Sequence, residues 1–447
     1  MQSNNKCECI ICKQNLPFKM PKDIINSVID GKLTIFAGAG VSSENEIVLP
    51  YSFYDSILIE FENPETLKKL SFPQLMTKYE KTFGRKKLIE KILSRFDFIE
   101  SFPELYERAT KFHNELRTVS YIKNIFTTNW DTYFENECGA VPFVSSEDFV
   151  FYDIPKRKVI KIHGSISNIS TIIATEKDYK NCYKNLENEL IGSSLKIALS
   201  TQTFIFFGYS LKDDDFQKIL ISLQKELKDF FPRFYFVTLE KNLDRAFLRK
   251  YNLIPITTDG TFFLHKLKNI LVRKKLLVKD EKFIKICQTL FRLNLIHEEA
   301  TNDEIILKFP SIIYTLAYQD GLQHALERIL QKYKTGEYSS PDEVFRIASG
   351  YQQKLSELQK SKEYLDSAYV QGYINGLYLL LLKNEAFKHI PFFYLYKKEL
   401  ECTYEEFQLL LEEHPVYHKS SARFAKKIVE ERSIGINNLT YHHPPIL

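Results

Sequence analysis

The chain has 447 residues, of which 44% are hydrophobic and 26% are charged. This is the composition of a globular protein, so a disordered or fibrous chain is excluded, and at roughly 150 residues per domain the length allows two or three domains. The 61 basic and 57 acidic residues leave a net charge of +4. Dedicated nucleic-acid binders carry a stronger or more concentrated basic excess, so no polyanionic partner is required.

The N-terminus and the cysteine count favour a cytoplasmic protein. The first residues lack the apolar run of a secretory signal. Seven cysteines are an odd and low number for this length, which disfavours a disulfide framework. The longest apolar stretch is interrupted by Gln371 and Asn375 and is too short to span a bilayer. We therefore expect a cytoplasmic chain without a membrane span.

Three cysteines, Cys7, Cys9 and Cys12, lie in an N-terminal extension over residues 1–22. A Cys-x-x-Cys pair supplies half of many structural zinc sites, but four ligands are needed. The missing ligand could be Cys138 or a histidine, and the alternative is that these cysteines are reduced surface or packing residues. A metal site here stays a possibility.

Short apolar runs then alternate with helical patterns as far as residue 267. The predicted strands are rich in β-branched and aromatic residues and lie at 33–37, 122–126, 159–162, 203–207 and 233–239. They are apolar on both faces, and helical stretches such as the one predicted within residues 73–96 separate them. This pattern predicts an α/β fold, in which helices cover both faces of a parallel sheet.

Beyond residue 275 the strand signals fade. A closing amphipathic helix is predicted at 265–275, and hydrophobic residues recur at helical spacing between residues 322 and 333. We therefore predict an all-helical C-terminal domain over residues 276–447. Its expected role is regulation, assembly or the sensing of a partner.

Local signals support this helical interpretation. Residues 340–343 and 403–406 each match the capping box that begins many helices. The pair His442 and His443 lies in a Pro-rich tail and is a weak metal signal. We interpret this tail as a solvated chain end.

A glycine-rich turn follows the first strand, over residues 38–42. Such a turn lets backbone amides approach a pyrophosphate, and the N-terminus of a following helix adds a favourable dipole. The alternative is a tight turn without a ligand. A dehydrogenase is a weaker interpretation, because Ser43 stands where a third glycine is expected and neither Asp55 nor Glu60 is placed at a strand end.

Polar loops follow three further predicted strands, at residues 127–131, 163–164 and 208–210. Each loop alone has a common structural explanation, such as a turn or a packed histidine. In an open parallel sheet, however, ligands bind at the carboxyl ends of the strands, so all four loops should meet in one crevice. Their shared placement predicts a nucleotide site.

Together the four motifs resemble the sirtuin family, in the order in which that family has them. Residues 38–42 match its Gly-Ala-Gly-x-Ser, and residues 127–131 resemble its Thr-Gln-Asn-x-Asp. His163-Gly164 matches its His-Gly, and residues 208–210 match its later Gly-x-Ser. The resemblance implies a Rossmann-type domain over residues 23–275 that binds NAD+ as its substrate.

The resemblance also implies roles for single residues. The residues that it places around the dinucleotide are Gly38, Ala39, Gly40, Val41, Ser42, Thr128, Asp131, Gly208 and Ser210. Asn129 would face the nicotinamide ribose and His163 the ribose hydroxyls, which makes these two the candidate catalytic residues. None of these residues is predicted to bind a metal.

Three departures separate the chain from protein-deacylating sirtuins, and one of them is Thr128, which stands where the family usually has glutamine. The four-cysteine zinc module is absent, because only Cys182 lies in that part of the sequence, with Cys138 before it, so no zinc is expected in this domain. Residues 47–53 replace the family's Gly-Ile-Pro-Asp-Phe-Arg segment and lack its arginine. These changes disfavour an acylated peptide substrate. The chain looks more like the divergent sirtuin-like domains of bacterial antiviral defence, which hydrolyse NAD+.

Cleavage of the nicotinamide–ribose bond builds positive charge on the ribose, as in glycoside cleavage, and nicotinamide leaves as a neutral base. Asn129 could position the attacking water, His163 could accept a proton, and Asp131 could stabilise the growing charge. We therefore predict an NAD+ glycohydrolase that yields nicotinamide and ADP-ribose, or a cyclised form of it. The alternatives are an NAD+-dependent protein deacylase and a non-enzymatic sensor of NAD+ or ADP-ribose.

An enzyme that depletes NAD+ must be held in check, so we expect autoinhibition until a trigger of antiphage defence arrives. A homo-oligomer is expected because symmetric assemblies are common. The sequence leaves the activator open among a phage protein, a co-encoded motor ATPase and a guide-loaded nucleic-acid complex.

Overall fold

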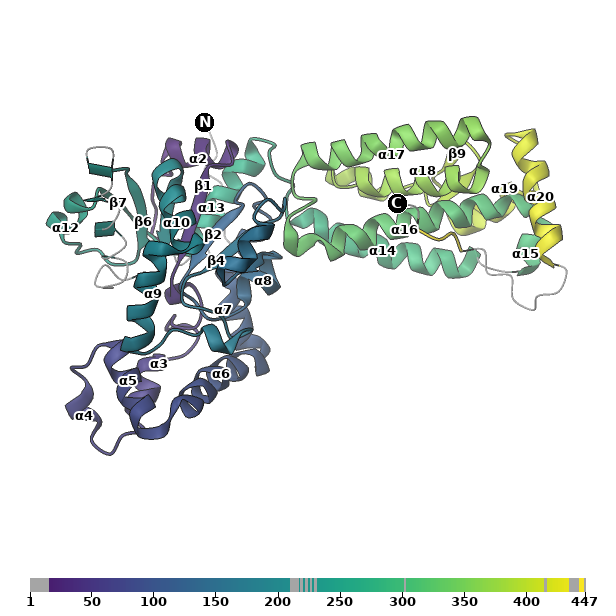
Figure 1. Ribbon diagram of the computed structural model, residues 1–447. Coiled ribbons are helices and arrows are strands. Elements are labelled where there is room, and N and C mark those ends of the chain that lie inside the picture. Colours follow the sequence, from purple (N-terminus) through teal and green to yellow (C-terminus); the bar gives the residue numbers. More distant parts are fainter. Residues whose placement is uncertain are drawn as a thin grey trace. The chain divides into compact units, whose positions relative to one another are not determined.

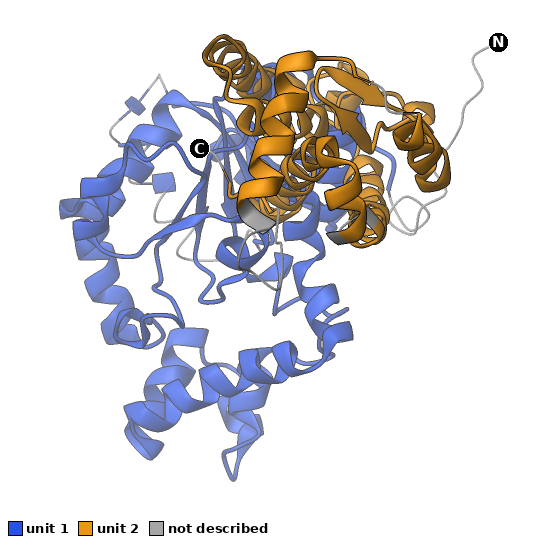
Figure 2. Cartoon of the chain, turned by 90° about the vertical axis from the view of Figure 1, so that its right-hand side faces the viewer, with its two compact units in different colours: residues 1–270 blue, residues 271–447 orange. Residues whose placement is uncertain are grey.

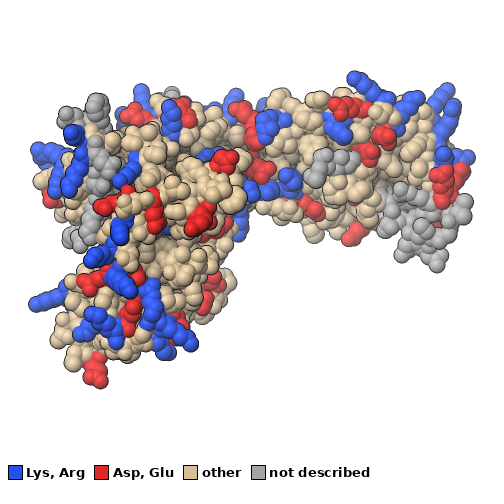
Figure 3. Space-filling model, in the orientation of Figure 1, with Lys and Arg blue, Asp and Glu red and all other residues tan. Residues whose placement is uncertain are grey.

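The computed structural model describes residues 16–209, 231–300, 303–413, 416–433 and 442–445, with isolated positions between 217 and 228. The chain divides into two compact units, residues 1–270 and 271–447, which are coloured separately in Figure 2. Cys7, Cys9 and Cys12 lie outside the described residues, and so does Ser210. On the face drawn in Figure 3, basic and acidic side chains are interspersed.

A parallel sheet of seven strands forms the centre of the first unit (Figure 1). The strands are β1 (Leu33–Ala37), β2 (Asn124–Thr127), β3 (Val141–Phe143), β4 (Lys158–Lys161), β5 (Thr203–Phe207), β6 (Phe234–Thr238) and β7 (Leu253–Thr257). Their order across the sheet is β3-β4-β2-β1-β5-β6-β7, and each neighbouring pair is parallel. This arrangement confirms the predicted α/β fold class.

Two strands, β3 and β7, were missed by the sequence interpretation. They are the two edges of the sheet, and each contains a proline, Pro142 and Pro255. Proline cannot donate a ladder hydrogen bond and is therefore confined to edge strands and strand ends, and its presence hides such strands from pattern reading.

Helices cover both faces of the sheet. The helices that the structure describes in this unit, apart from those near the strand ends described below, are α2 (Lys22–Ile29), α7 (Pro103–Leu116), α8 (Tyr133–Cys138), α9 (Glu176–Asn188), α10 (Leu190–Thr201), α12 (Arg245–Lys250) and α13 (Gly260–Arg273). On one face, the strand side chains Phe36 and Phe206 share a core with Leu195 and Leu199 of α10. On the other, the ring of Phe207 lies 5.1 Å from that of Phe112 and 5.4 Å from that of Phe263. Burial on both faces explains why these strands are continuously apolar.

Four further helices form a small layer beyond the carboxyl ends of the strands (Figure 1). They are α3 (Phe53–Leu58), α4 (Pro64–Leu67), α5 (Phe72–Phe83) and α6 (Arg85–Ser101). This layer has its own core, in which Ile57, Leu75, Met76, Leu88 and Ile92 are buried. It contains the helical stretch that the sequence predicts within residues 73–96.

The second unit is mostly helical, as predicted. Its helices are α14 (Glu281–Ala300), α15 (Asp303–Lys308), α16 (Ile313–Gln331), α17 (Pro341–Ser361), α18 (Tyr364–Tyr378), α19 (Tyr404–Glu412) and α20 (Lys419–Ser433). The central helix α16 is buried without interruption from Ile313 to Leu322. The antiparallel strands β8 (Phe393–Leu395) and β9 (Lys398–Leu400) form a short hairpin that the sequence interpretation missed.

The two predicted helix starts differ in detail. Thr403 and Glu406 form the reciprocal capping box that the sequence predicts at the start of α19. Ser340 is the residue before α17, but its side chain makes no capping hydrogen bond there. Among the described helices, none combines the length and the apolar character that crossing a membrane requires.

Candidate active site

A cavity of about 950 Å³ lies at the carboxyl ends of the central strands. Its volume falls within the range of small-molecule sites, about 300 to 1,000 Å³. The strand order reverses around β1, whose neighbours are β2 and β5, and open α/β sheets bind ligands at such a switch point. The predicted site residues that line this cavity are Ala39, Gly40, Thr128, Asn129, Asp131, His163 and Gly208.

The turns after β1 and β5 touch through their backbones. The amide of Gly40 donates to the carbonyl oxygen of Gly208 at 3.2 Å, and Gly208 has a φ of +68°. A Cβ atom on Gly38 would lie only 2.6 Å from that same carbonyl oxygen. The glycines are therefore needed for the contact between these two turns, because a side chain would force them apart.

The prediction that a helix follows directly after the first turn is wrong. Residues Ala39–Val41 form a single turn of 3-10 helix, η1, and Ser42 leaves it with φ −139° and ψ −109°. Most amides of this turn already donate to backbone carbonyl oxygens, among them those of Gly40, Val41 and Ser42, and no long helix stands behind the turn. The sequence interpretation expected a helix here because serines, such as Ser42 and Ser43, are common at the position just before a helix.

Ser42 lies behind the cavity wall and not on it. Its hydroxyl donates to Oδ2 of Asp131 at 2.8 Å and accepts from Nδ2 of Asn129 at 3.2 Å. Gly38, Val41 and Ser42, which the resemblance places around the dinucleotide, are not among the residues that line the cavity. Ser42 instead ties the first turn to the loop after β2.

Asn129 is held from both its backbone and its side chain. Its amide nitrogen donates to Oγ1 of Thr127 at 3.0 Å, and that hydroxyl donates to the carbonyl oxygen of Ala37 at 2.8 Å. Asn129 is only 4% exposed, and its Oδ1 atom is buried without a hydrogen-bond partner. Buried hydrogen-bond acceptors are normally paired, so the unpaired Oδ1 of a residue in the cavity wall is suited to accept a hydrogen bond from a bound ligand or water.

The carboxylate of Asp131 is fixed by its own chain segment. Oδ1 accepts from the amide of Tyr133 at 3.2 Å, while Oδ2 accepts from Ser42. The fully buried ammonium of Lys161 donates to the backbone oxygen of Asp131 and pairs with Glu135 at 3.2 Å. These contacts set the position of the loop after β2 against β4.

His163 is a neutral base in this structure. It is 6% exposed, and burial lowers the pKa of its imidazole to about 4. The ring of Tyr179 meets it edge-on, with centroids 5.0 Å apart. Gly164 has a φ of +80°, and a Cβ atom there would lie 2.1 Å from the carbonyl oxygen of Thr171, so only glycine allows the sharp turn that follows His163.

Thr128 stands where sirtuins usually have glutamine, and the structure gives it a specific contact. Its hydroxyl shares a hydrogen bond of 2.6 Å with the hydroxyl of Tyr209, which in turn donates to the carbonyl oxygen of Ala37 at 3.4 Å. Tyr209 thus bridges the loops after β2 and β5. It also lines the cavity, on the side where Gly208 lies.

Arg95 and Glu44 also line the cavity, and the sequence interpretation missed both. The Arg95 guanidinium is 6% exposed, pairs with Oε1 of Glu44 at 2.9 Å and donates to the carbonyl oxygen of Ser43 at 2.9 Å. Burial raises the pKa of Glu44. Arg95 therefore brings a buried positive charge to the cavity from α6.

A sequence signal for Arg95 was available. Leu88, Ile92, Phe96 and Ile99 recur at helical spacing and form the buried face of α6. Arg95 falls on that same face, where a charged residue is rare unless it is paired or functional.

The two cysteines nearest to this site are packed, each against a different carbonyl group. Cys138 contacts the backbone oxygen of His113 at 3.3 Å, and Cys182 contacts that of Ile162 at 3.6 Å. Burial raises the pKa of the Cys138 thiol to about 12. A metal ligand must be a thiolate, so Cys138 is poorly suited to complete a site with the N-terminal cysteines.

Residues 123–256 match the family model described as SIR2-like domain. This stretch includes β2 to β6, most of β7, and the motifs of Asn129, His163 and Gly208. The chain contains a SIR2-like domain. The recognition of sirtuin motifs in the sequence is thereby confirmed.

Curated relatives of this SIR2-like domain come from bacteria. The chain is 25% identical over 252 residues to a protein named defense-associated sirtuin 2 from Bacillus subtilis, covering 53% of this chain and 22% of that protein. It is 27% identical over 210 residues to NAD(+) hydrolase ThsA from Cytobacillus dafuensis, covering 44% of this chain and 39% of the relative. The ThsA of Enterococcus faecium is 26% identical over 215 residues, covering 46% of this chain and 43% of the relative. The matches thus span less than half the length of each relative.

Proposed function

We propose that the SIR2-like domain hydrolyses NAD+ at the bond between nicotinamide and ribose. The products are nicotinamide and ADP-ribose, or a cyclised form if a ribose hydroxyl attacks. The observation that carries this proposal is that the orphan amide oxygen of Asn129 and the neutral imidazole of His163 line the same cavity as the glycine-rich turn. Two relatives named NAD(+) hydrolase support the same reaction.

We expect backbone groups of the glycine-rich turn and the guanidinium of Arg95 to hold the dinucleotide. We expect the pyrophosphate to lie against Ala39 and Gly40, which line the cavity. Arg95 supplies positive charge from α6, in place of the arginine that the 47–53 segment lacks. We expect the adenosine side to lie along Gly208 and Tyr209, which line the cavity.

The nicotinamide side meets a wall of aromatic rings. The ring of Trp130 lies 6.0 Å from that of Phe53 and 6.1 Å from that of Phe72, and all three residues line the cavity. The indole nitrogen of Trp130 is buried without a hydrogen-bond partner. An apolar wall with a few fixed polar groups is how proteins orient a small aromatic ligand.

The reaction needs orientation and one base. The attacking water donates one hydrogen bond to Oδ1 of Asn129, which holds its lone pair toward the anomeric carbon. As the carbon–nitrogen bond breaks, its electron pair leaves with nicotinamide, and the proton of the attacking water passes to the neutral imidazole of His163. The fixed carboxylate of Asp131 stabilises the positive charge that develops on the ribose.

In the cell this activity serves triggered antiphage defence, since one relative carries the name of a defence-associated sirtuin. Depletion of NAD+ in the cytoplasm requires that the resting enzyme is inhibited, and the helical second unit is the candidate regulator, through homo-oligomer assembly or through sensing. The candidate activators are a phage protein, a co-encoded motor ATPase and a guide-loaded nucleic-acid complex.

Release of nicotinamide from NAD+ by the purified chain tests the proposal, with each candidate activator present or absent. Wild type with its activator is expected to release nicotinamide, and His163→Ala is expected to bind NAD+ without releasing it. Equal turnover by His163→Ala contradicts the assignment of this base. Nicotinamide release that depends on an acyl-lysine peptide identifies a deacylase, and binding without turnover under all conditions identifies a sensor.

A further inference from the structure

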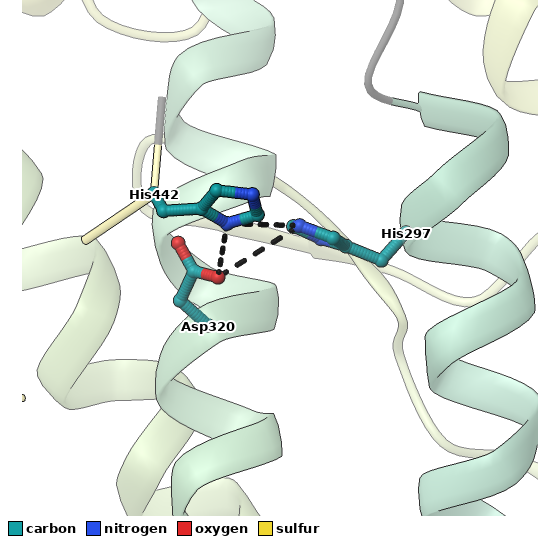
Figure 4. Close-up of side chains that lie close together, drawn as sticks. All are labelled: His297, Asp320 and His442. Atoms are coloured by element: carbon teal, nitrogen blue, oxygen red, sulfur yellow. Dashed lines mark hydrogen bonds and ion pairs between the residues drawn. The ribbon is translucent and has the colours of Figure 1, made fainter. Parts of the chain in front are cut away.

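Two histidines and one aspartate meet inside the second unit, far along the chain from the SIR2-like motifs. His297 comes from α14, Asp320 from α16 and His442 from the C-terminal tail, and Figure 4 shows all three side chains pointing toward one another. Nε2 of His297 lies 3.4 Å from Nδ1 of His442 and 3.8 Å from Oδ1 of Asp320. Nδ1 of His442 lies 3.2 Å from that same oxygen.

We propose that His297, Asp320 and His442 bind one divalent transition metal ion, with Zn²⁺ as the best match. This inference is independent of NAD+ hydrolysis. Among the residues that the structure describes, these three form the one group of histidine, cysteine and carboxylate side chains whose ligand atoms come within 4.8 Å of one another.

The separations of the three atoms fit a shared metal ion, and two of them are also hydrogen-bond distances. A distance of 3.8 Å is too long for a hydrogen bond between His297 and Asp320. The nearest point equidistant from three atoms with these separations lies in their plane, about 2.0 Å from each. An ion displaced from that plane toward a fourth ligand would have slightly longer bonds, still within the usual range for Zn–N and Zn–O. The triangle is therefore close to one face of a zinc coordination tetrahedron.

Neighbouring groups orient the first histidine as a ligand. The fully buried Gln319 donates from Nε2 to the carbonyl oxygen of Phe392 at 3.0 Å, so its Oε1 faces Nδ1 of His297 at 2.9 Å. That nitrogen must carry the proton of the neutral ring, which leaves the lone pair of Nε2 directed at the cluster. Metal-binding histidines are commonly fixed by such a partner on the other nitrogen.

The aspartate is prepared in a similar way. Its Oδ2 accepts from the backbone amide of His443 at 2.7 Å, so Oδ1 is the oxygen presented to the cluster. Asp320 is 4% exposed, and a buried carboxylate is costly unless it is paired with a donor or coordinates a metal. Its Oδ1 lies 3.2 Å from Nδ1 of His442, and a divalent ion bound between them would supply the compensating charge.

The donor set selects the class of metal. Two imidazole nitrogens and one carboxylate oxygen suit Zn²⁺ and neighbouring transition ions, whereas Mg²⁺ and Ca²⁺ prefer oxygen ligands alone. His442 has a side chain that is 55% exposed, so water can occupy a fourth position. The ion would fasten the C-terminal tail to α14 and α16.

The tail also has an anchor that needs no metal. Nε2 of His443 lies 2.8 Å from Asp366, and its ring stacks on Tyr369 with centroids 4.6 Å apart. The interpretation of this tail as a solvated end is therefore wrong for His443, whose side chain is 9% exposed. Adjacent residues thus provide a test variant and a matched control: His442→Ala removes a proposed ligand, and His443→Ala removes only the other anchor.

The experiment uses the full chain with Cys7, Cys9 and Cys12 changed to serine, so that thiolates at the N-terminus contribute no zinc. After equilibration with Zn²⁺ and removal of excess ion, metal analysis should find about one Zn²⁺ per chain in this background and in His443→Ala, and almost none in His442→Ala. Co²⁺ should bind with a visible spectrum of nitrogen and oxygen ligation, without thiolate charge-transfer bands. His442 lies in an exposed tail, so its loss should leave the helical circular dichroism unchanged.

Zinc retained by His442→Ala at the level of His443→Ala would overturn the proposal. So would a background protein that takes up no Zn²⁺ or Co²⁺, since the three side chains would then form a polar cluster only. Asp320→Asn adds an independent check, because it keeps the size of the side chain and removes the anionic ligand. Its Zn²⁺ affinity is expected to fall by about 10- to 100-fold or more.

Discussion

Asn129 donates to the hydroxyl of Ser42 at 3.2 Å, and that single bond fixes the orientation of its side-chain amide. Because Ser42 itself donates to Asp131, it can only accept from Asn129, so Nδ2 is the atom turned toward it. Oδ1 is then left as an acceptor without a partner. Ser42, a buried residue of the first turn, therefore positions the side chains of Asn129 and Asp131 in the loop after β2.

Asn129→Ala should lower NAD+ cleavage by about 100-fold or more, because it removes the acceptor that orients the water. The fold should lose only about 1 kcal/mol, the worth of one hydrogen bond to Ser42. Nicotinamide release and urea unfolding measure the two effects. Asn136→Ala, on the exposed side of α8, is the control and should change neither. Full activity in Asn129→Ala would remove this residue from the mechanism.

The buried imidazole of His163 predicts an unusual pH profile. Its pKa of about 4 means that the base stays unprotonated down to that pH, whereas an ordinary histidine loses half its base form near pH 6.5. Nicotinamide release under substrate saturation should therefore stay within about twofold between pH 7 and pH 5.5. Tryptophan fluorescence at each pH verifies that the protein is folded. A tenfold loss over this interval in folded protein would show that His163 titrates normally.

The central strands and the loops after them could be predicted because both follow from local pattern. Strands buried on both faces are continuously apolar, and polar residues at their carboxyl ends must meet at one edge of the sheet. What could not be predicted depends on contacts between distant segments. Arg95 reaches the cavity only because α6 packs beside the first turn, and Ser42 turns away from it because Asp131 and Asn129 occupy its hydroxyl.

The edge strands, the short hairpin and the packing of the tail could not be predicted from the sequence either. β3 and β7 carry prolines that argue against strands, yet an edge position tolerates them. The hairpin of β8 and β9 has only three residues in each strand, too few for a period-two pattern to stand out. His443 gave no sign of its stacking partner Tyr369, which lies in a different helix.

The same substitution should act in opposite directions at two glycines. Gly38→Ala places a Cβ atom 2.6 Å from the carbonyl oxygen of Gly208, so the turns must separate, and we expect both lower stability and loss of NAD+ binding. Gly350→Ala lies inside α17 with no atom within 4 Å of the new Cβ, and should gain about 1 kcal/mol from better helix propensity. Urea unfolding measures both variants. Equal effects of one sign would contradict the predicted contact between the two turns.

The Arg95–Glu44 pair predicts that a single substitution is worse than a double one. Arg95→Met leaves the Glu44 carboxylate, which is 28% exposed, without its cation, and should cost about 2 kcal/mol of folding free energy. Adding Glu44→Gln removes the unpaired charge and should restore part of that stability, but not the NAD+ affinity that Arg95 provides. Urea unfolding and the KM for NAD+ separate the two roles. If both variants unfold alike, the ion pair contributes nothing to folding.

His113 makes a prediction about acid stability. It is fully buried in α7, its two ring nitrogens have no hydrogen-bond partner, and burial lowers its pKa to about 4. In the unfolded chain the pKa returns to about 6.5, so between these two values the unfolded state binds more protons than the folded state. The stability that depends on a neutral His113 is therefore complete above pH 6.5 and is lost progressively as the pH falls toward 4.

His113→Leu should remove this loss, because leucine packs against Phe112 and Phe134 with no group to protonate. The variant should be more stable than wild type at pH 7, since two unpaired buried nitrogens disappear, and the advantage should grow at pH 5. Urea midpoints at the two pH values measure it. His163 contributes an acid dependence of the same sign in both proteins, so only the difference between them reports on His113. A difference that shrinks at pH 5 would mean that His113 is protonated in the folded protein and has found a partner there.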